Sequence, residues 1–162
     1  MIYIFDIDGT IANIKHRLHF IQNLWGVKGS IPDPKCNNFK PDWDAFFNAC
    51  GDDAPIPEVI ALLRELADHN TIIFITGRSD AIRDKTIAWL NWYVGFFHYE
   101  SLYMRKAGDH RPDHIVKSEL LDQILQFSPL DKILGVFEDR KPVVDMYRAR
   151  GLQVYQVAEG DF

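Results

Sequence analysis

Acidic, hydroxyl and basic residues follow several short apolar runs of the sequence, and these polar residues are the ones that could carry chemistry. The first run is followed by Asp6-Ile7-Asp8-Gly9-Thr10, the second by Thr76-Gly77-Arg78-Ser79, the third by Arg105-Lys106 and the fourth by Glu138-Asp139-Arg140. In an open α/β sheet, ligands bind outside the carboxyl ends of the strands. If the runs are parallel strands, they bring carboxylates, a hydroxyl and several cations to one edge.

Such a collection suits phosphate chemistry. Clustered carboxylates repel one another unless a cation shares them, and hard oxygen ligands favour Mg²⁺. Asp6 and Asp139 can supply anionic oxygens, and Asp8 can supply a backbone carbonyl. The metal would neutralise negative charge, so that a carboxylate can approach a phosphate dianion. We therefore predict a Mg²⁺-dependent enzyme that transfers phosphate.

Each polar residue then has a chemical part to play. Asp6 can attack phosphorus and form an aspartyl-phosphate. Asp8, two residues on, can protonate the leaving alkoxide and later activate water, which requires Asp8 to be protonated when the leaving group departs. Thr76 offers a hydroxyl to a phosphate oxygen, and Gly77 allows the backbone to approach closely. The start of the next helix offers free N–H groups to an anion.

The elements that must position these residues alternate along the chain. Five apolar, β-branched runs are predicted as buried parallel strands: Ile2–Phe5, Thr71–Ile75, Ser101–Met104, Ile133–Phe137 and Gln153–Val157. Four segments between them have helical spacing: Pro57–His69, Asp80–Val94, Asp113–Phe127 and Pro142–Arg150, the last followed by Gly151 as a C-terminal cap. The alternation predicts an α/β protein with a mostly parallel sheet and helices on both faces.

One segment, from about Asn13 to Pro55, interrupts the alternation. It holds Lys15–Trp25 and Pro41–Cys50 as predicted helices, joined by a loop around Gly29–Asn38. An insertion of this length after a strand is typical of a lid or a substrate-binding element, and packing decoration is the alternative.

Aromatic residues of this insertion could stack on a base or a sugar. Trp25, beside Gly26, is the better stacking candidate, and Phe39 is another. Trp43 is a third stacking candidate, although its helical spacing with Phe46 and Phe47 favours the core for all three.

Composition bounds the class of protein. The chain has 162 residues, 47% hydrophobic and 25% charged, which suits one globular domain. No apolar run approaches the roughly 20 residues of a membrane span, and no basic region precedes the first apolar stretch, so we expect a cytoplasmic protein. Cys36 and Cys50 fit no metal or disulfide pattern and are expected to be reduced.

The formal net charge of −5 is not that of a protein that coats nucleic acid. It leaves room for an enzyme that grips one strand end through a small basic patch. Of the six histidines, His16, His19 and His110 could line a phosphate-binding mouth, while most are expected at the surface. The stretch Trp89–Tyr99 could be core or a dimer face, and we favour core; the oligomeric state stays open.

The residues Asp6-x-Asp8-Gly9-Thr10, Thr76, Lys117 and Glu138-Asp139 resemble the four motifs of the haloacid dehalogenase (HAD) superfamily of phosphatases. The resemblance implies one Rossmann-like domain over residues 1–162, with a small helical cap at about 13–55. It implies that Asp6 is the nucleophile and a metal ligand, Asp8 the general acid and base, and Thr76 and Lys117 the phosphate-binding pair. Relatives often carry two aspartates at the last motif, so whether Glu138 or Asp139 touches the metal stays open, and we favour Asp139.

The last two-thirds of the chain resembles more specifically the phosphatase domain of bacteriophage polynucleotide kinases. The shared stretches are Thr76-Gly77-Arg78, Arg105 to Lys117, Glu138 to Arg148, and the ending from Gln156 to Phe162. That family removes 3′-phosphates from polynucleotide ends and is fused to a P-loop kinase, whose motif this chain lacks, so a kinase step would come from another protein. Candidate substrate-binding residues are Gly9, Thr10, Gly77, Arg78, Arg105, Arg111 and Arg140.

Three functions therefore stand side by side. The first is a 3′-phosphatase acting on nucleic-acid ends or nucleotides, with Arg78, Arg105, Lys106 and Arg111 near the phosphates. The second is a small-molecule phosphatase, such as a 5′-nucleotidase or a sugar phosphatase, which net acidity and a long lid favour. The third is a non-catalytic module that binds phosphate ends, against which the intact set of Asp6, Asp8, Lys117 and Asp139 argues. The sequence does not choose between DNA, RNA and a mononucleotide.

Overall fold

The computed structural model describes residues 1–22 and 39–160. Several sequence predictions fall outside these residues: Trp25, Cys36, the loop around Gly29–Asn38, the end of the helix expected at Lys15–Trp25, and Asp161 and Phe162. Within the described part of the chain, no helix is long and apolar enough to cross a membrane. Cys50 is a buried free thiol.

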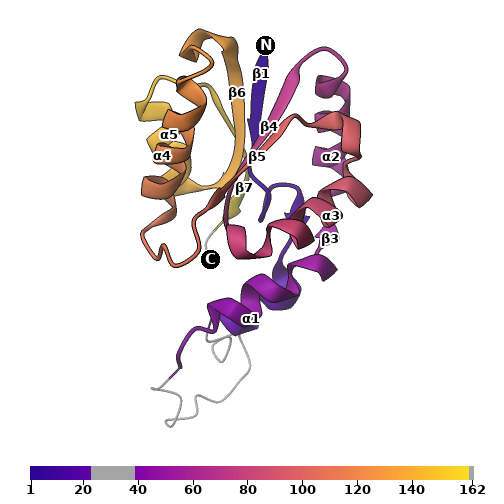
Figure 1. The fold of residues 1–162 in the computed structure, drawn as a ribbon, viewed down its shortest axis with the longest axis vertical. Helices are drawn as coiled ribbons and strands as arrows, with labels where there is room; N and C mark the ends of the chain where they lie inside the picture. Colours follow the sequence, from indigo (N-terminus) through magenta and orange to yellow (C-terminus); the bar gives the residue numbers. More distant parts are fainter. Residues whose placement is uncertain (23–38, 161–162) are drawn as a thin grey trace.

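Five parallel strands form the central sheet, in the order β5-β4-β1-β6-β7 (Figure 1). They are β1 (Ile2–Phe5), β4 (Thr71–Ser79), β5 (Ser101–Arg105), β6 (Ile133–Arg140) and β7 (Val154–Gly160). The predicted α/β class and all five strand positions are confirmed. β4 and β6 run three or more residues further than expected, through register shifts after Thr76 and Glu138, so polar residues continue the strands past their apolar cores.

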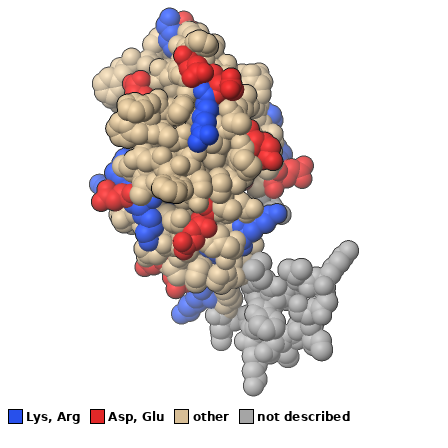
Figure 2. All heavy atoms as spheres, turned by 90° about the vertical axis from the view of Figure 1, so that its right-hand side faces the viewer, with Lys and Arg blue, Asp and Glu red and all other residues tan. Residues whose placement is uncertain are grey.

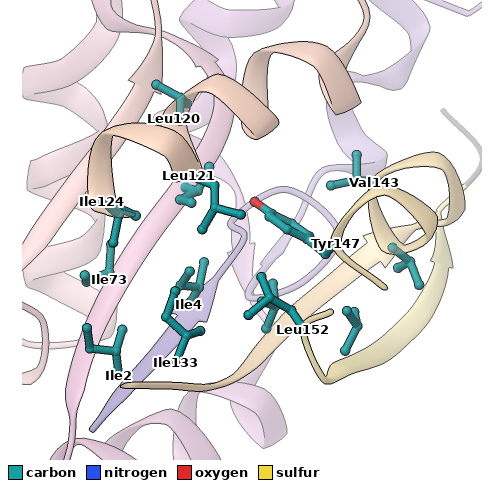
Figure 3. Packing of buried hydrophobic residues seen from close by; sticks show 14 of the residues in the cluster. Ile2, Ile4, Ile73, Leu120, Leu121, Ile124, Ile133, Val143, Tyr147 and Leu152 are labelled. Atoms are coloured by element: carbon teal, nitrogen blue, oxygen red, sulfur yellow. The ribbon is translucent and has the colours of Figure 1, made fainter. Parts of the chain in front are cut away.

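Helices cover both faces of the sheet because each strand is apolar on both sides. On one face lie α2 (Pro57–Ala67) and α3 (Arg83–Tyr93), and on the other α4 (Asp113–Leu125) and α5 (Lys141–Ala149). Figure 3 shows the second face, where Leu121 of α4 and Tyr147 of α5 lie over Ile4 of β1. A short 3₁₀ helix, η4 (Asp80–Ile82), precedes α3, and Gly151, with φ of +84°, follows α5 as predicted.

Residues 13–55, called the insertion here, leave the sheet after β1. The two-stranded pair β2 (Ala12–Asn13) and β3 (Ala54–Pro55) closes its base, and it holds the 3₁₀ helices η1 (Lys15–Phe20) and η3 (Ala49–Asp52) and the helix α1 (Trp43–Asn48). Helix α1 starts later than the predicted Pro41 because Asp42 caps it, its side chain accepting a hydrogen bond from the Ala45 N–H at 2.9 Å. In Figure 1, α1 projects from one end of the sheet.

A buried ion pair fastens the insertion to the core. The guanidinium of Arg17 donates to both carboxylate oxygens of Asp53, at 2.7 and 2.8 Å, and both side chains are fully buried. Arg17 also lies over the ring of Phe46, 4.1 Å from its centroid. The indole N–H of Trp89 in α3 donates to the Asp53 carbonyl at 2.8 Å. Both ends of the insertion are thereby tied to each other and to α3.

Two expectations about aromatic residues need correction. Phe46 is buried as expected, but Trp43 is 46% exposed, so its assignment to the core is wrong. The core assignment of Trp89–Tyr99 holds for Trp89, whereas Trp92 and Phe97 are 80% and 92% exposed. A helix at a protein surface buries one side only, and Trp92 lies on the outer side of α3.

The exposed surface beside α2 and α3 carries charges of both signs. Figure 2 shows acidic and basic side chains interspersed there, between larger uncharged areas. No broad basic area is visible on this face, which agrees with the net negative charge of the chain.

Replacing Asp53 with Ala is expected to destabilise the fold strongly, because it leaves Arg17 buried without its partner. Breaking one side of a buried ion pair costs about 3–5 kcal/mol. Urea denaturation followed by circular dichroism should show this loss in the free energy of unfolding. Asp145→Ala, which removes an exposed partner of Lys141, is the control and should change little. Equal midpoints for the two variants would show that the insertion does not depend on this pair.

Candidate active site

The polar residues singled out in the sequence meet at the carboxyl edge of the sheet. Asp6 directly follows β1, Thr76 lies in β4, and Glu138 and Asp139 lie in β6. Lys117 reaches the same place from α4. All five side chains are buried, as is Asp8. Burial of this many ionisable groups costs free energy unless they pair, so their contacts decide what the site can do.

Lys117 lies between two carboxylates. Its ammonium donates to Oδ1 of Asp6 and to Oε2 of Glu138, each at 2.7 Å. Carboxylate oxygens of Asp6, Glu138 and Asp139 all lie within 4.8 Å of one another. Three carboxylates facing one ammonium would leave two negative charges if all were ionised. A divalent cation fits this donor set in charge and in ligand type.

The Asp139 side chain lies in a narrow space, and one of its carboxylate oxygens lacks a partner among the described residues. Its buried Oδ1 has no hydrogen-bond partner among the described residues. A Cβ added to Gly9 would lie 2.1 Å from Oδ2 of Asp139, and one added to Gly160 would lie 2.0 Å away. Gly9, considered from sequence for substrate binding, thus packs against a carboxylate of the set that could hold a metal ion. The β7 residue Gln156 donates to the Asp139 carbonyl at 3.1 Å.

The protonation of this group follows from its burial. Burial raises the pKa of Asp6 to about 8, with Glu138 and Asp8 adding to the rise and Lys117 opposing it. Burial likewise raises the pKa of Asp139 to about 9, helped by the charges of Asp6 and Glu138. For Lys117, burial opposes the charge, but Asp6 and Glu138 outweigh it and raise its pKa well above the usual value. Lys117 therefore stays charged while the carboxyls favour sharing protons or a cation.

Asp8 belongs to a second group of charges. Its Oδ1 accepts hydrogen bonds from Arg78 at 2.6 and 2.8 Å and from Arg17 at 2.7 Å, and Arg78 also binds Asp53 at 2.6 Å. Burial opposes ionisation of Asp8, but Arg78 and Arg17 outweigh it and lower its pKa. Oδ2 of Asp8 makes no hydrogen bond with described residues. Arg78 is fully buried here, so it contacts Asp8 and Asp53 rather than lying at the mouth of the site.

The remaining predicted cations differ in how they are engaged. Arg105 and Arg140 both bind Asp113, Arg140 at 2.6 Å, and Arg105 also donates to the Gly77 carbonyl at 2.9 Å. Arg111 binds Asp109 and Glu119 near the surface. Among the hydroxyls, Thr76 accepts from the Arg78 N–H at 3.2 Å, and Thr10 Oγ1 is buried with no partner among described groups.

Three residues of the site were missed in the sequence. Asp113 orients two arginines, and a Cβ on Gly77 would lie 2.5 Å from its Oδ1. Its spacing of four residues before Lys117 places both on one face of α4, which could have pointed to it. Arg17 and Asp53 lie far apart in the chain, and no local pattern links them. The ring Nε2 of His16 donates to Oδ1 of Asp53 at 2.8 Å, whereas His110 lines the pocket described next.

A pocket of about 330 Å³ opens above these carboxylates. Asp6, Asp8 and Lys117 line its inner end. One wall comes from α1 of the insertion and the other from the segment after β5; the lining includes Trp43, Phe46, Phe47, Arg105, Lys106 and Arg111. Its volume lies within the range of small-molecule sites.

Solved structures with a similar fold include a chain of an RNA repair complex and two hydrolases described as haloacid dehalogenase-like or HAD-type. A chain of the Pnkp1/Rnl/Hen1 RNA repair complex is 27% identical, with a TM-score of 0.69, over 99% of this chain and 43% of that chain. A haloacid dehalogenase-like hydrolase from Streptococcus pneumoniae is 17% identical, with a TM-score of 0.63, over 96% of this chain and 83% of that one. The HAD-hydrolase YfnB from Bacillus subtilis, bound to magnesium, is 10% identical, with a TM-score of 0.63, over 94% and 86%.

These likenesses confirm the HAD fold, and the chain spans less than half the length of the repair-complex chains it matches. A family model described as the polynucleotide kinase PNKP phosphatase domain matches residues 42–162, well over half of the chain. The match begins inside the insertion and includes every predicted site residue from Thr76 onward. The chain therefore belongs to the PNKP phosphatase-domain family of HAD-type phosphatases.

Proposed function

We propose that this phosphatase removes 3′-phosphates from polynucleotide ends, with Mg²⁺ as cofactor and Asp6 as nucleophile. The chemistry is inferred from the surroundings of Asp6. This residue lines the pocket, binds Lys117 and lies close to the carboxylates of Glu138 and Asp139. Asp8 lines the same pocket as a second carboxylate with a separate set of partners. Nucleophile and acid/base are thus kept in different electrostatic surroundings.

Asp6 and Asp139 would hold Mg²⁺ through carboxylate oxygens, and the orphaned Oδ1 of Asp139 supports this role. Glu138, already bound to Lys117 at 2.7 Å, would hold metal-bound water. Asp8 would add its backbone carbonyl. When bound, Mg²⁺ offsets the negative charge of the carboxylates and of the phosphate, which lets the two approach.

In the first chemical step, an Asp6 carboxylate oxygen forms a bond to phosphorus while the bond from phosphorus to the leaving oxygen breaks. The leaving alkoxide takes a proton from Oδ2 of Asp8, the oxygen that the arginines leave unbound. In the second step, Asp8 accepts a proton from water, which attacks phosphorus and frees Asp6. Lys117 and the Thr76 hydroxyl bind phosphate oxygens, since Thr76 accepts from Arg78 and keeps its own proton to donate.

Arg17 and Arg78 keep Asp8 ionised in the free enzyme, which suits its role as base in the second step. The first step needs the protonated acid. A phosphate dianion bound beside Asp8 disfavours a second negative charge there, and so raises the pKa of Asp8 when substrate is in place. We infer that substrate binding favours the protonated form of Asp8, which can then donate its proton to the leaving oxygen.

The choice of a polynucleotide end rests on the family and on the pocket. The family is defined by the phosphatase domain of polynucleotide kinase, and one similar chain belongs to an RNA repair complex. We further propose that residues 1–162 act as one catalytic domain, with residues from about 13 to 55 as its cap. The insertion supports this by lining the pocket with Trp43 and Phe47.

The assignment is tested by phosphate release with Mg²⁺ and with EDTA. Substrates are a 3′-phosphorylated oligonucleotide as DNA and as RNA, its 5′-phosphorylated twin, and the 3′- and 5′-mononucleotides. We expect Mg²⁺-dependent release from 3′-phosphorylated ends and a rate at least about 1,000-fold lower in Asp6→Asn, because the nucleophile is lost.

Faster release from mononucleotides than from oligonucleotides would reassign the enzyme as a nucleotidase. A folded wild-type protein that releases phosphate from none of these substrates would contradict the proposed function. Denaturation curves of wild type and Asp6→Asn serve as the control for folding.

Mg²⁺ binding is expected to tighten as pH rises. The pKa values of about 8 for Asp6 and about 9 for Asp139 mean that both hold protons at neutral pH without metal. The cation displaces these protons, and each one released makes affinity rise by up to about tenfold per pH unit. Titration calorimetry should therefore show a dissociation constant at least about fivefold lower at about pH 7.5 than at about pH 6.5.

The metal-free fold should respond in the opposite sense. Both folded pKa values lie above the usual carboxyl value of 3.8, so the folded state binds more protons than the unfolded chain. Without metal, the free energy of unfolding should fall as pH rises from about 4 to about 9.

A Mg²⁺ affinity that does not change with pH would contradict the displacement of protons from Asp6 and Asp139 by the cation.

Gly160→Ala is expected to weaken Mg²⁺ binding, since its Cβ would fall 2.0 Å from Oδ2 of Asp139 and displace that carboxylate. Disturbing the support of a metal ligand costs about 10- to 100-fold in affinity. The control is Gly51→Ala, whose Cβ would meet only the Lys85 side chain at an ordinary 3.5 Å. Calorimetry that gives equal Mg²⁺ affinities for both variants would exclude a metal-binding Asp139 in this position.

A further inference from the structure

The pocket above Asp6 has two unlike walls. On the insertion side, the ring of Trp43 lies beside those of Phe46 and Phe47, with centroids 5.7 and 6.0 Å away. The second wall, formed by the end of β5 and the segment that follows it, carries Arg105, Lys106 and Arg111. Aromatic and cationic side chains that line one pocket suit a base joined to a phosphate backbone.

Most cations of the second wall are already engaged. Arg105 binds Asp113 and three backbone carbonyls, at Gly77, Asp109 and Arg111. The Arg111 guanidinium donates three hydrogen bonds to the carboxylate of Asp109 and two to the carboxylate of Glu119. Lys106 is exposed, and its side-chain ammonium makes no hydrogen bond or ion pair with the residues that the structure describes. Its ammonium is therefore available to an anion at the pocket mouth.

The side chain of Trp43 is likewise only partly buried by its packing. It remains 46% exposed although it is a large aromatic residue, and Phe46 beneath it is buried. Phe46 in turn contacts Arg17, so α1 and its aromatic side chains rest on a buried anchor. An indole ring fixed in this way offers a flat surface without needing to be ordered first, which favours stacking.

We propose that Trp43 stacks on the nucleobase of the terminal nucleotide, while Lys106 binds the next phosphate along the strand. The inference rests on the proposed function and goes further, because it assigns the pocket walls to separate parts of a single-stranded end. Stacking accepts any base, since every base has a π-face. The enzyme should therefore require a base at the end of the strand but not a particular one.

The stacking is tested with two 3′-phosphorylated oligonucleotides that differ only in the last nucleotide, one with a normal base and one with an abasic tetrahydrofuran residue. Trp43→Ala should raise KM for the first about 5- to 100-fold and leave kcat within about twofold, as stacking energies of single bases imply. The same variant should not change KM for the abasic substrate. Phe97→Ala, which removes another exposed aromatic side chain that does not line this pocket, is the matched control.

Lys106 is tested through salt. Lys106→Ala should weaken binding of the oligonucleotide but not of the 3′-mononucleotide, which lacks the second phosphate. The dependence of log affinity on log salt concentration should become shallower by about 0.7, the value for one phosphate contact on a single strand. Lys132→Ala, an exposed lysine outside this pocket, is the control.

Equilibrium binding measurements separate the proposed phosphatase function from the proposed stacking subsite. Fluorescence anisotropy with Asp6→Asn and the labelled 3′-phosphorylated oligonucleotide measures the subsite without turnover. If wild type releases no phosphate but Trp43→Ala still weakens binding of the base-bearing end alone, only the proposed function fails. If wild type releases phosphate but Trp43→Ala affects the normal and abasic ends equally, the stacking subsite is wrong. Absence of both release and binding would overturn both.

Discussion

Four buried carboxylates lie at the carboxyl edge of the sheet, and cations divide them into two groups. Asp6 and Glu138 bind Lys117 and lie close to Asp139, while Asp8 pairs with two arginines. Buried charges of like sign are tolerated only where partners offset them. The first group is short of positive charge and is suited to a divalent cation. The second is balanced by the protein's own residues. Asp6 and Asp8 are two positions apart, yet they meet opposite electrostatic conditions.

The second group also determines how the insertion attaches. Arg17 comes from η1, Asp53 from the residue before β3, and Arg78 from the end of β4. Each side chain is fully buried and pairs with at least one of the others. The insertion therefore docks through the same ions that lower the pKa of Asp8. A change in that docking would alter the acid/base group directly, so fold and chemistry share one set of contacts.

Local pattern was sufficient to predict the sheet, the four main helices and the residues that follow each strand. Periodicity and strand-end chemistry are local properties, and Asp6, Thr76 and Asp139 could be found from them. The partners of Asp8 could not, because Arg17 and Asp53 meet only through tertiary structure. For the same reason Arg78 was predicted near the substrate phosphates, and its buried contacts with Asp8 and Asp53 were not foreseen. Trp43 was assigned to the core because helical spacing shows which residues share a face, but not which face is covered.

Trp43 and Arg17 link the pocket wall to the chemistry. Arg17 contacts Asp8 on one side and the ring of Phe46 on the other, and Phe46 packs edge-on against Trp43. Trp43 is thus connected to Asp8 by direct contacts through Phe46 and Arg17. A base stacked on Trp43 would therefore lie next to the aromatic pair that contacts the guanidinium bound to Asp8. We infer that the insertion serves both to receive the end of a strand and to fix the orientation of the residue that must protonate its leaving oxygen.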